Sequence, residues 1–155
     1  MISGLAQVIG MKPTLRSFFS GAPPCANTSV AVFSGKNCEI AASAVGVSIE
    51  KVRVITGDTG VTPYGGGTWA SRGAGIGGEA VLQAGLVLRE NILATAEAIL
   101  QRERAGLKVH SGAVVDARTN ERVLELAELG RIAYFRSDTL PKTFTPELMV
   151  TRHYA

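Results

Sequence analysis

A glycine-crowded segment from Gly65 to Gly78 carries the residues of this chain that are best suited to chemistry. It combines glycines with the hydroxyls of Thr68 and Ser71 and the guanidinium of Arg72. Glycine lets a backbone approach a ligand closely, and free backbone N–H groups before a helix form an anion site. A guanidinium matches the oxygens of a phosphate. The segment therefore predicts a site for a phosphate-bearing ligand or cofactor, with an ordinary tightly packed loop as the alternative.

The formal dinucleotide signature inside this segment has the wrong surroundings. Gly73 to Gly78 satisfies G-x-G-x-x-G, but the nearest expected strand ends near Thr56, well before the first glycine. In a dinucleotide-binding fold that strand ends directly before the glycines. No lysine follows the glycines at the P-loop spacing. The sequence therefore argues against a Rossmann-type site and against a P-loop.

Side chains with catalytic or metal-binding potential are sparse. Ser71 is not in a G-x-S-x-G context, and Cys38 is expected to be a small core residue. His110 and His153 have no acidic or cysteine neighbours at ligand spacing. Glu79 is expected to stabilise a helix N-terminus through its charge. We therefore assign no catalytic residue and no metal ligand from the sequence.

The composition bounds the class of protein. A length of 155 residues fits one domain, and 46% hydrophobic residues suffice for a core. Charged residues make up 19%, below the usual level of about 25%, which indicates surface covered by a ligand or by more protein. The net charge of +3 is scattered, which argues against a nucleic-acid partner. No secretory signal or membrane-spanning stretch is visible, and two unpaired cysteines fit a cytoplasmic protein.

The glycine segment lies between a predicted strand and a predicted long helix. Apolar residues from about 78 to 104 recur at three- and four-residue steps in a wide band, which predicts a helix buried on more than one side. Upstream, Glu39–Val45 is predicted as a short helix that ends at Gly46. Residues 51–56 alternate as a half-buried strand, and Ser29–Phe33 is predicted as another short strand.

The remaining elements complete a fold of mixed class. Residues 1–28 show no clear apolar period and are expected to form a poorly ordered or loosely docked arm. Residues 107–116 predict a hairpin with its turn at Ser111 and Gly112, and residues 123–134 predict a second helix before an extended tail. The sequence thus predicts an α+β (mixed α/β) fold with short strands, one long buried helix and one or two shorter helices.

Several stretches resemble the large, molybdopterin-binding subunit of the molybdenum hydroxylases, the group of xanthine dehydrogenase, aldehyde oxidase and aerobic carbon monoxide dehydrogenase. The family's pattern runs from a strand through G-D-T and P-x-G-x-G-T-x-A/G-S-R to G-G-x-A and a long helix. The matching residues are Val52–Thr59, Thr62–Arg72 and Gly77–Val81, preceded by the similar helix Cys38–Val47 and followed by the similar stretch 107–154. The resemblance covers about residues 38–155.

The resemblance implies a cofactor and a reaction. In such subunits the Thr-x-Ala-Ser-Arg loop lies against molybdopterin or molybdopterin cytosine dinucleotide, which carries molybdenum. The intact enzyme would hydroxylate a heterocycle or an aldehyde with water as the oxygen source. Its electrons would pass to FAD-binding and 2Fe-2S partners. The cofactor-binding residues that the resemblance implies are Gly67, Thr68, Trp69, Ala70, Ser71, Arg72 and Gly73.

The chain also departs from that family. Val30–Phe33 stands where the family has G-Q-G-H, and the family's catalytic glutamate lies beyond Ala155. We therefore expect residues 1–37 to be a divergent N-terminal arm and residues 38–155 to be a partial molybdopterin-binding domain. On this interpretation the chain is a fragment of a large subunit and is inactive alone. A standalone phosphate- or nucleotide-binding module and a non-functional remnant stay open as alternatives.

Overall fold

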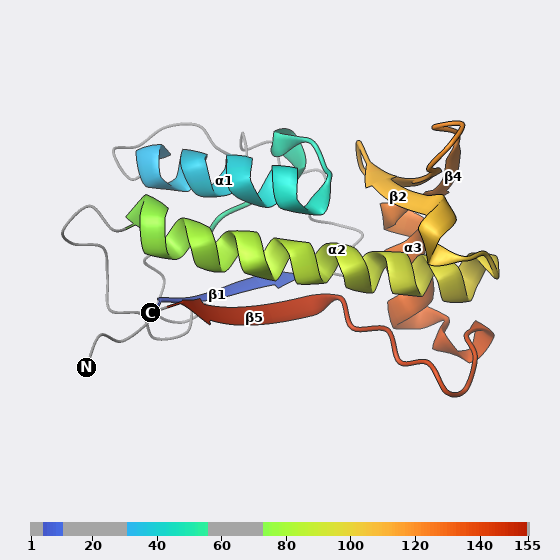
Figure 1. The fold of residues 1–155 in the computed structure, drawn as a ribbon. Coiled ribbons are helices and arrows are strands. Elements are labelled where there is room, and N and C mark those ends of the chain that lie inside the picture. The colour runs from blue at the N-terminus through green and yellow to red at the C-terminus, as the bar shows by residue number, and fades with distance from the viewer. Residues whose placement is uncertain (1–4, 11–30, 56–72, 155) are drawn as a thin grey trace.

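A computed structural model of the protein describes residues 5–10, 31–55 and 73–154. Figure 1 shows helix α1 (Ala31–Val45) lying along helix α2 (Gly78–Leu100), with a ribbon of two strands on the other side of α2. A small sheet and helix α3 (Leu126–Phe135) gather at the far end of α2 (Figure 1). The fold is α+β, as the sequence predicts. No helix in the described ranges is long and apolar enough to cross a membrane.

Helix α2 is the axis of the fold and confirms the predicted long helix. It contacts α1, both strands of the ribbon, the small sheet and α3. The helix ends at Leu100, before the predicted end, because Gln101 adopts a left-handed conformation with φ of 54° and bonds back to Glu97 O. Leu82 and Leu86 belong to the predicted apolar band but are partly exposed. The buried residues of α2 are Gly78, Ala80, Val81, Ala84, Gly85, Leu88, Ile92, Leu93, Thr95 and Ala96.

Helices α1 and α2 pack closely because their contact uses the smallest side chains. A Cβ added at Gly85 would lie 2.6 Å from Ala44 Cβ, and one added at Gly78 would lie 2.9 Å from Ile40 Cδ1. Gly78 of α2 lies against Ile40 of α1, and seven residues later Gly85 lies against Ala44. The order of contacts is thus the same along both helices, so the helices are parallel and begin at the same end of the molecule (Figure 1). The contact therefore fixes where the two N-termini meet.

Helix α1 ends as predicted but begins earlier. Gly46, with φ of +90°, donates to Ala42 O at 2.9 Å, so it forms the expected C-terminal cap. Its backbone lies against β2, since a Cβ there would be 2.6 Å from Val109 O. The predicted strand Ser29–Phe33 is wrong from Ala31 onward, where α1 already runs. A short apolar run does not distinguish a strand from a buried helix, and tertiary packing decides between them.

The predicted strand at residues 51–56 is also wrong in the residues that the structure describes. Ile49–Lys51 forms a short 3-10 turn, and Val52 to Ile55 are not assigned to a strand. Val52 does have extended backbone angles, φ −99° and ψ 130°. The polar–apolar alternation of this stretch therefore reflects an extended segment that pairs with no neighbouring strand in the described structure. Thr56 lies outside the described residues.

Three short antiparallel strands form the small sheet, in the order β2 (Leu107–His110), β3 (Ala113–Asp116) and β4 (Arg122–Glu125). The predicted hairpin turn is confirmed, because Ser111 and Gly112 have positive φ of 49° and 80°. The predicted second helix starts later than expected, at Leu126, because residues 122–125 pair with β3 instead. That pairing is a tertiary preference that helix propensity does not capture.

The two ends of the described chain pair in a ribbon of strands β1 (Leu5–Gly10) and β5 (Met149–Tyr154). The ribbon is antiparallel and sets Leu5 opposite Tyr154. The expectation of a poorly ordered or loosely docked arm is therefore wrong for residues 5–10. Local sequence could not show this, because the partner strand lies almost the whole chain away. Ribbon, sheet and helices share one core, built from Val45, Ala84, Leu88, Ile92, Leu93, Ala96, Leu107, Val109, Val114, Leu126, Leu129, Ala133, Leu148 and Val150.

The contact of α1 with α2 predicts the effect of one added methyl group. Gly85→Ala is expected to lower the free energy of unfolding by about 1–3 kcal/mol, because the new Cβ would overlap Ala44. Gly106→Ala is the matched control, since no atom of the described ranges lies within 4 Å of a Cβ there. Urea unfolding followed by circular dichroism measures both variants. Equal midpoints for the two variants would contradict the packing described.

The turn after β3 predicts a dependence of stability on pH. The backbone N–H groups of Arg118 and Thr119 donate to Asp116 Oδ1 at 2.8 and 3.1 Å, and they lower the pKa of this carboxyl below 3.8. A lowered folded-state pKa stabilises the protein above the unfolded-state value, and this stabilisation is lost as pH falls through the folded-state pKa. Asp116→Asn is expected to weaken the loss of stability in acid. Urea midpoints from about pH 5 downward test this, and identical acid profiles would refute it.

Candidate functional site

The shared beginning of α1 and α2 is the part of the described structure best suited to bind an anion. The first amides of a helix have no partner within the helix, and the helix dipole adds positive potential there. Two parallel helices of 15 and 23 residues direct these amides and dipoles toward the same end (Figure 1). Their fields therefore add rather than cancel. This region is called the N-terminal end below and comprises the start of α1, the turn Gly73–Gly77 and the start of α2.

The glycine turn extends α2 toward this end. Gly73–Gly77 forms one turn of π-helix that runs directly into α2, since Gly77 already has helical angles of φ −65° and ψ −42°. Gly77 has no side chain that could cap α2. A glycine-rich turn that leads directly into a long helix is a setting in which helix N-termini bind anions, and it fits the predicted phosphate site.

Two glycines at the N-terminal end have open space beside them in the described structure. No described atom lies within 4 Å of a Cβ added at Gly35 in α1 or at Gly75 in the glycine turn. Neither has a positive φ, so the expected use of glycine for left-handed backbone is not found at these positions. A glycine inside a helix destabilises it by about 0.5–1 kcal/mol relative to alanine. The open space leaves room for another group to approach the backbone closely at these two positions.

One buried polar atom at this end lacks a partner. The side chain of Asn37 in α1 is 9% exposed, and no described residue donates a hydrogen bond to its Oδ1. This oxygen lies 3.9 Å from the position of a Cβ at Gly78, the first residue of α2. Asn37 therefore places an acceptor beside the first turn of α2.

The charged groups near the N-terminal end are largely paired. Glu79 lies in the first turn of α2, as predicted, and accepts a hydrogen bond from Gln83 Nε2 at 3.0 Å. Lys36 Nζ forms an exposed ion pair with Glu39 Oε2 at 2.9 Å. In the part of the chain that the structure describes, no group of three or more histidine, cysteine or acidic side chains is placed to hold a metal. The described part of this end thus offers amides and an amide side chain rather than metal ligands.

Most of the predicted cofactor-binding residues lie outside the described part of the chain. These are Gly67, Thr68, Trp69, Ala70, Ser71 and Arg72. Gly73, the last of the set, begins the glycine turn at the N-terminal end. Cys38 is fully buried, as expected for a core residue, and His110 lies at the end of β2, in the small sheet. Sequence reasoning missed Gly35 and Asn37, because the sequence did not show that α1 begins as early as Ala31 or that it lies against α2.

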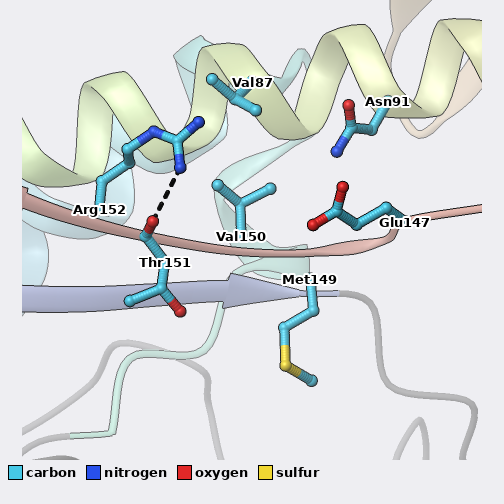
Figure 2. Close-up of a pocket in the computed structure, with 7 residues that line it drawn as sticks. All are labelled: Val87, Asn91, Glu147, Met149, Val150, Thr151 and Arg152. Atoms are coloured by element: carbon cyan, nitrogen blue, oxygen red, sulfur yellow. Dashed lines mark hydrogen bonds between the residues drawn. The ribbon is translucent and has the colours of Figure 1, made fainter.

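A hollow of about 530 Å³ lies between α2 and β5. Figure 2 shows the Arg152 guanidinium and the Glu147 carboxylate on opposite sides of Val150, with Val87 above. Arg152 Nη1 donates to Thr151 O at 2.9 Å. Its described lining is Val87, Asn91, Glu147, Met149, Val150, Thr151 and Arg152, and Gly73, the described member of the predicted cofactor-binding set, is not among them. The N-terminal end is therefore the stronger candidate site.

Comparisons with known proteins identify the family of the chain. A family model described as a molybdopterin cofactor-binding domain matches residues 34–155. The xanthine dehydrogenase molybdenum-binding subunit of Escherichia coli O157:H7 is 34% identical over 121 residues, covering 77% of this chain and 16% of that protein. The nicotine 6-hydroxylase large subunit of Paenarthrobacter nicotinovorans is 27% identical over 134 residues, with coverages of 80% and 16%. The chain thus spans about 16% of the length of these curated relatives.

Solved structures share the fold. Quinoline 2-oxidoreductase from Pseudomonas putida 86 matches with a TM-score of 0.70 and 26% identity, over 98% of this chain and 19% of that one. Reconstituted CO dehydrogenase from Oligotropha carboxidovorans matches with a TM-score of 0.69 and 20% identity, over 99% of this chain and 18% of that one. The likeness includes the described residues 5–10, which the sequence resemblance does not cover. The expected resemblance to molybdenum hydroxylase large subunits is confirmed.

The open space beside Gly35 among the described residues predicts that a substitution there raises stability. Gly35→Ala is expected to raise the free energy of unfolding by about 0.5–1 kcal/mol, because alanine favours the helix and nothing lies near its Cβ. Urea unfolding of the ligand-free chain measures this change. A loss of stability would show that Gly35 serves the packing of α1 itself.

Proposed function

The chain belongs to the family of molybdopterin cofactor-binding domains, and we propose that it holds the cofactor at the N-terminal end of α1 and α2. The observation that carries this proposal is the parallel start of the two helices at one end of the fold (Figure 1). Molybdopterin ends in a phosphate group, and backbone amides at helix N-termini bind phosphate. The dipoles of both helices favour the same negative charge.

The described residues at this end fit such a group. The glycine turn Gly73–Gly77 offers amides, and Gly75 leaves open space above the backbone. Asn37 supplies a buried acceptor without a donor from the described residues. In this proposal Gly67, Thr68, Trp69, Ala70, Ser71 and Arg72 continue the same binding surface. The donor set serves molybdopterin and its cytosine dinucleotide form equally, because both present phosphate oxygens to it.

The proposal for the complete protein is broader. In this proposal the chain is part of the large subunit of a molybdenum hydroxylase. The bound cofactor supplies molybdenum redox chemistry for the hydroxylation of a heterocycle or an aldehyde. The names of the relatives, a xanthine dehydrogenase subunit and a nicotine 6-hydroxylase subunit, support this reaction class. FAD-binding and 2Fe-2S subunits, or the remainder of the large subunit, are the partners in this proposal, and the cytoplasm is its location.

Residues 38–155 act in this proposal as part of the cofactor-binding domain, preceded by the divergent stretch 1–37. The chain's own role is to bind and orient the cofactor. We assign no catalytic base within it, so the proposal includes inactivity of the chain alone. The alternative of a standalone phosphate- or nucleotide-binding module uses the same amides, and the identity of the bound molecule separates the two functions.

A single charge at the glycine turn tests the proposed function. The chain, produced in cells that make the molybdenum cofactor, is expected to purify with pterin and molybdenum. Gly75→Asp is expected to lower the bound pterin at least tenfold, because a carboxylate beside the phosphate opposes it. The fold should persist, since an acidic residue is favourable near a helix N-terminus. Pterin fluorescence after acid oxidation and metal analysis measure the bound cofactor.

Gly106→Asp is the matched control for this experiment. Gly106 also faces open space, but it follows α2 at the opposite end from the glycine turn. This variant should keep the pterin content of the wild-type chain. A wild-type chain that purifies with a nucleotide and without pterin would replace the proposed function with the module alternative. Equal pterin in both variants would move the site away from the N-terminal end.

A further inference from the structure

The buried amide oxygen of Asn37 carries a second inference, which rests on the proposed function. Asn37 lies on the face of α1 that contacts α2, in a row of small buried residues that continues with Cys38, Ala41 and Ala42. A polar side chain is out of place in this row. Its Oδ1 exposes almost no surface, and no donor among the described residues reaches it.

A buried acceptor such as Asn37 Oδ1 destabilises the fold unless a donor forms a hydrogen bond to it. A buried acceptor without a donor destabilises a protein, whereas an apolar side chain of the same shape at that position would not. Buried side-chain oxygens in folded proteins almost always have a partner. An unpaired acceptor in the apolar contact between two helices therefore indicates that a donor arrives from outside the described residues.

Water is a poor candidate for this donor. A buried water needs two to four polar partners to be held. Within 4 Å of a Cβ built at Gly78, the described side chains contribute the Ile40 methyl and Oδ1 itself, so they offer a water at that point no second polar partner. The nearby cationic side chain, Lys36, is exposed and already paired with Glu39.

The position of Asn37 indicates that the bound ligand supplies this donor. Its Oδ1 lies beside Gly78, directly after the glycine turn to which the proposed function assigns the cofactor. The amides of that turn are donors and suit phosphate oxygens, whereas Oδ1 is an acceptor and suits an N–H group. The aminopyrimidinone ring of a pterin carries such N–H groups. We propose that Asn37 Oδ1 accepts a hydrogen bond from the pterin ring system of the bound cofactor.

The test compares the release of pterin from three chains loaded during expression. Asn37→Leu keeps the approximate size of the side chain and removes the acceptor. It is expected to release pterin about tenfold faster than the wild-type chain during dialysis, which is the effect of one lost hydrogen bond to a buried group. The ligand-free variant should be at least as stable to urea as the wild type, because an unpaired acceptor has been removed.

Asn91→Leu is the matched control. Asn91 is a half-buried asparagine on α2 that lines the hollow beside β5, away from the N-terminal end. This variant should release pterin at the wild-type rate. If Asn37→Leu fails to fold, Asn37→Ala replaces it, because truncation removes the acceptor without adding bulk.

The outcomes separate this inference from the proposed function. A folded Asn37 variant that releases pterin at the wild-type rate overturns the role of Asn37 and leaves the proposed function in place. A marked loss of urea stability in the ligand-free variants also overturns it, because Asn37 would then serve the contact of α1 with α2. A wild-type chain that never carries pterin overturns both proposals.

Discussion

The close contact of α1 with α2 is the constraint on which the rest of the structure depends. At Gly85 the absence of a side chain brings Ala44 within a distance that no Cβ could share. This approach holds the helices parallel, and parallel helices begin at the same end. Neighbouring parallel helices have unfavourable dipole–dipole interactions, so the arrangement is retained through packing rather than electrostatics. The two helix N-termini meet at that end as a result, and the proposed anion site depends on their meeting.

The sequence predicted the parts of the fold that local pattern determines. The wide apolar band identified α2, Gly46 identified the end of α1, and Ser111 and Gly112 identified a hairpin that the structure confirms. Prediction from the sequence failed where contacts with distant parts of the chain decide the secondary structure. Residues 31–33 joined a helix because α1 packs on α2, and residues 122–125 joined a sheet because β3 offered a free edge. The ribbon of β1 and β5 has no local signature at all.

The candidate site was predicted from chemistry more than from structure. Glycines before a long helix indicated an anion site, and the likeness to molybdenum hydroxylases agreed with that interpretation. Within the described residues, only Gly73 of the predicted set can be placed. The features that the structure adds, Gly35 and Asn37, depend on α1 lying beside α2. Their meaning comes from a contact between segments far apart in the chain, so a pattern within either segment could not reveal it.

The ribbon that joins Leu5–Gly10 to Met149–Tyr154 has a consequence for how the fold is reached. The two strands lie far apart in the sequence, so their pairing requires the closure of a long loop. During synthesis β1 leaves the ribosome long before β5 and lacks this partner until β5 follows. Such nonlocal pairing is slow and exposes strands to wrong partners. The pairing of β1 with β5 is therefore a step of folding that is open to aggregation.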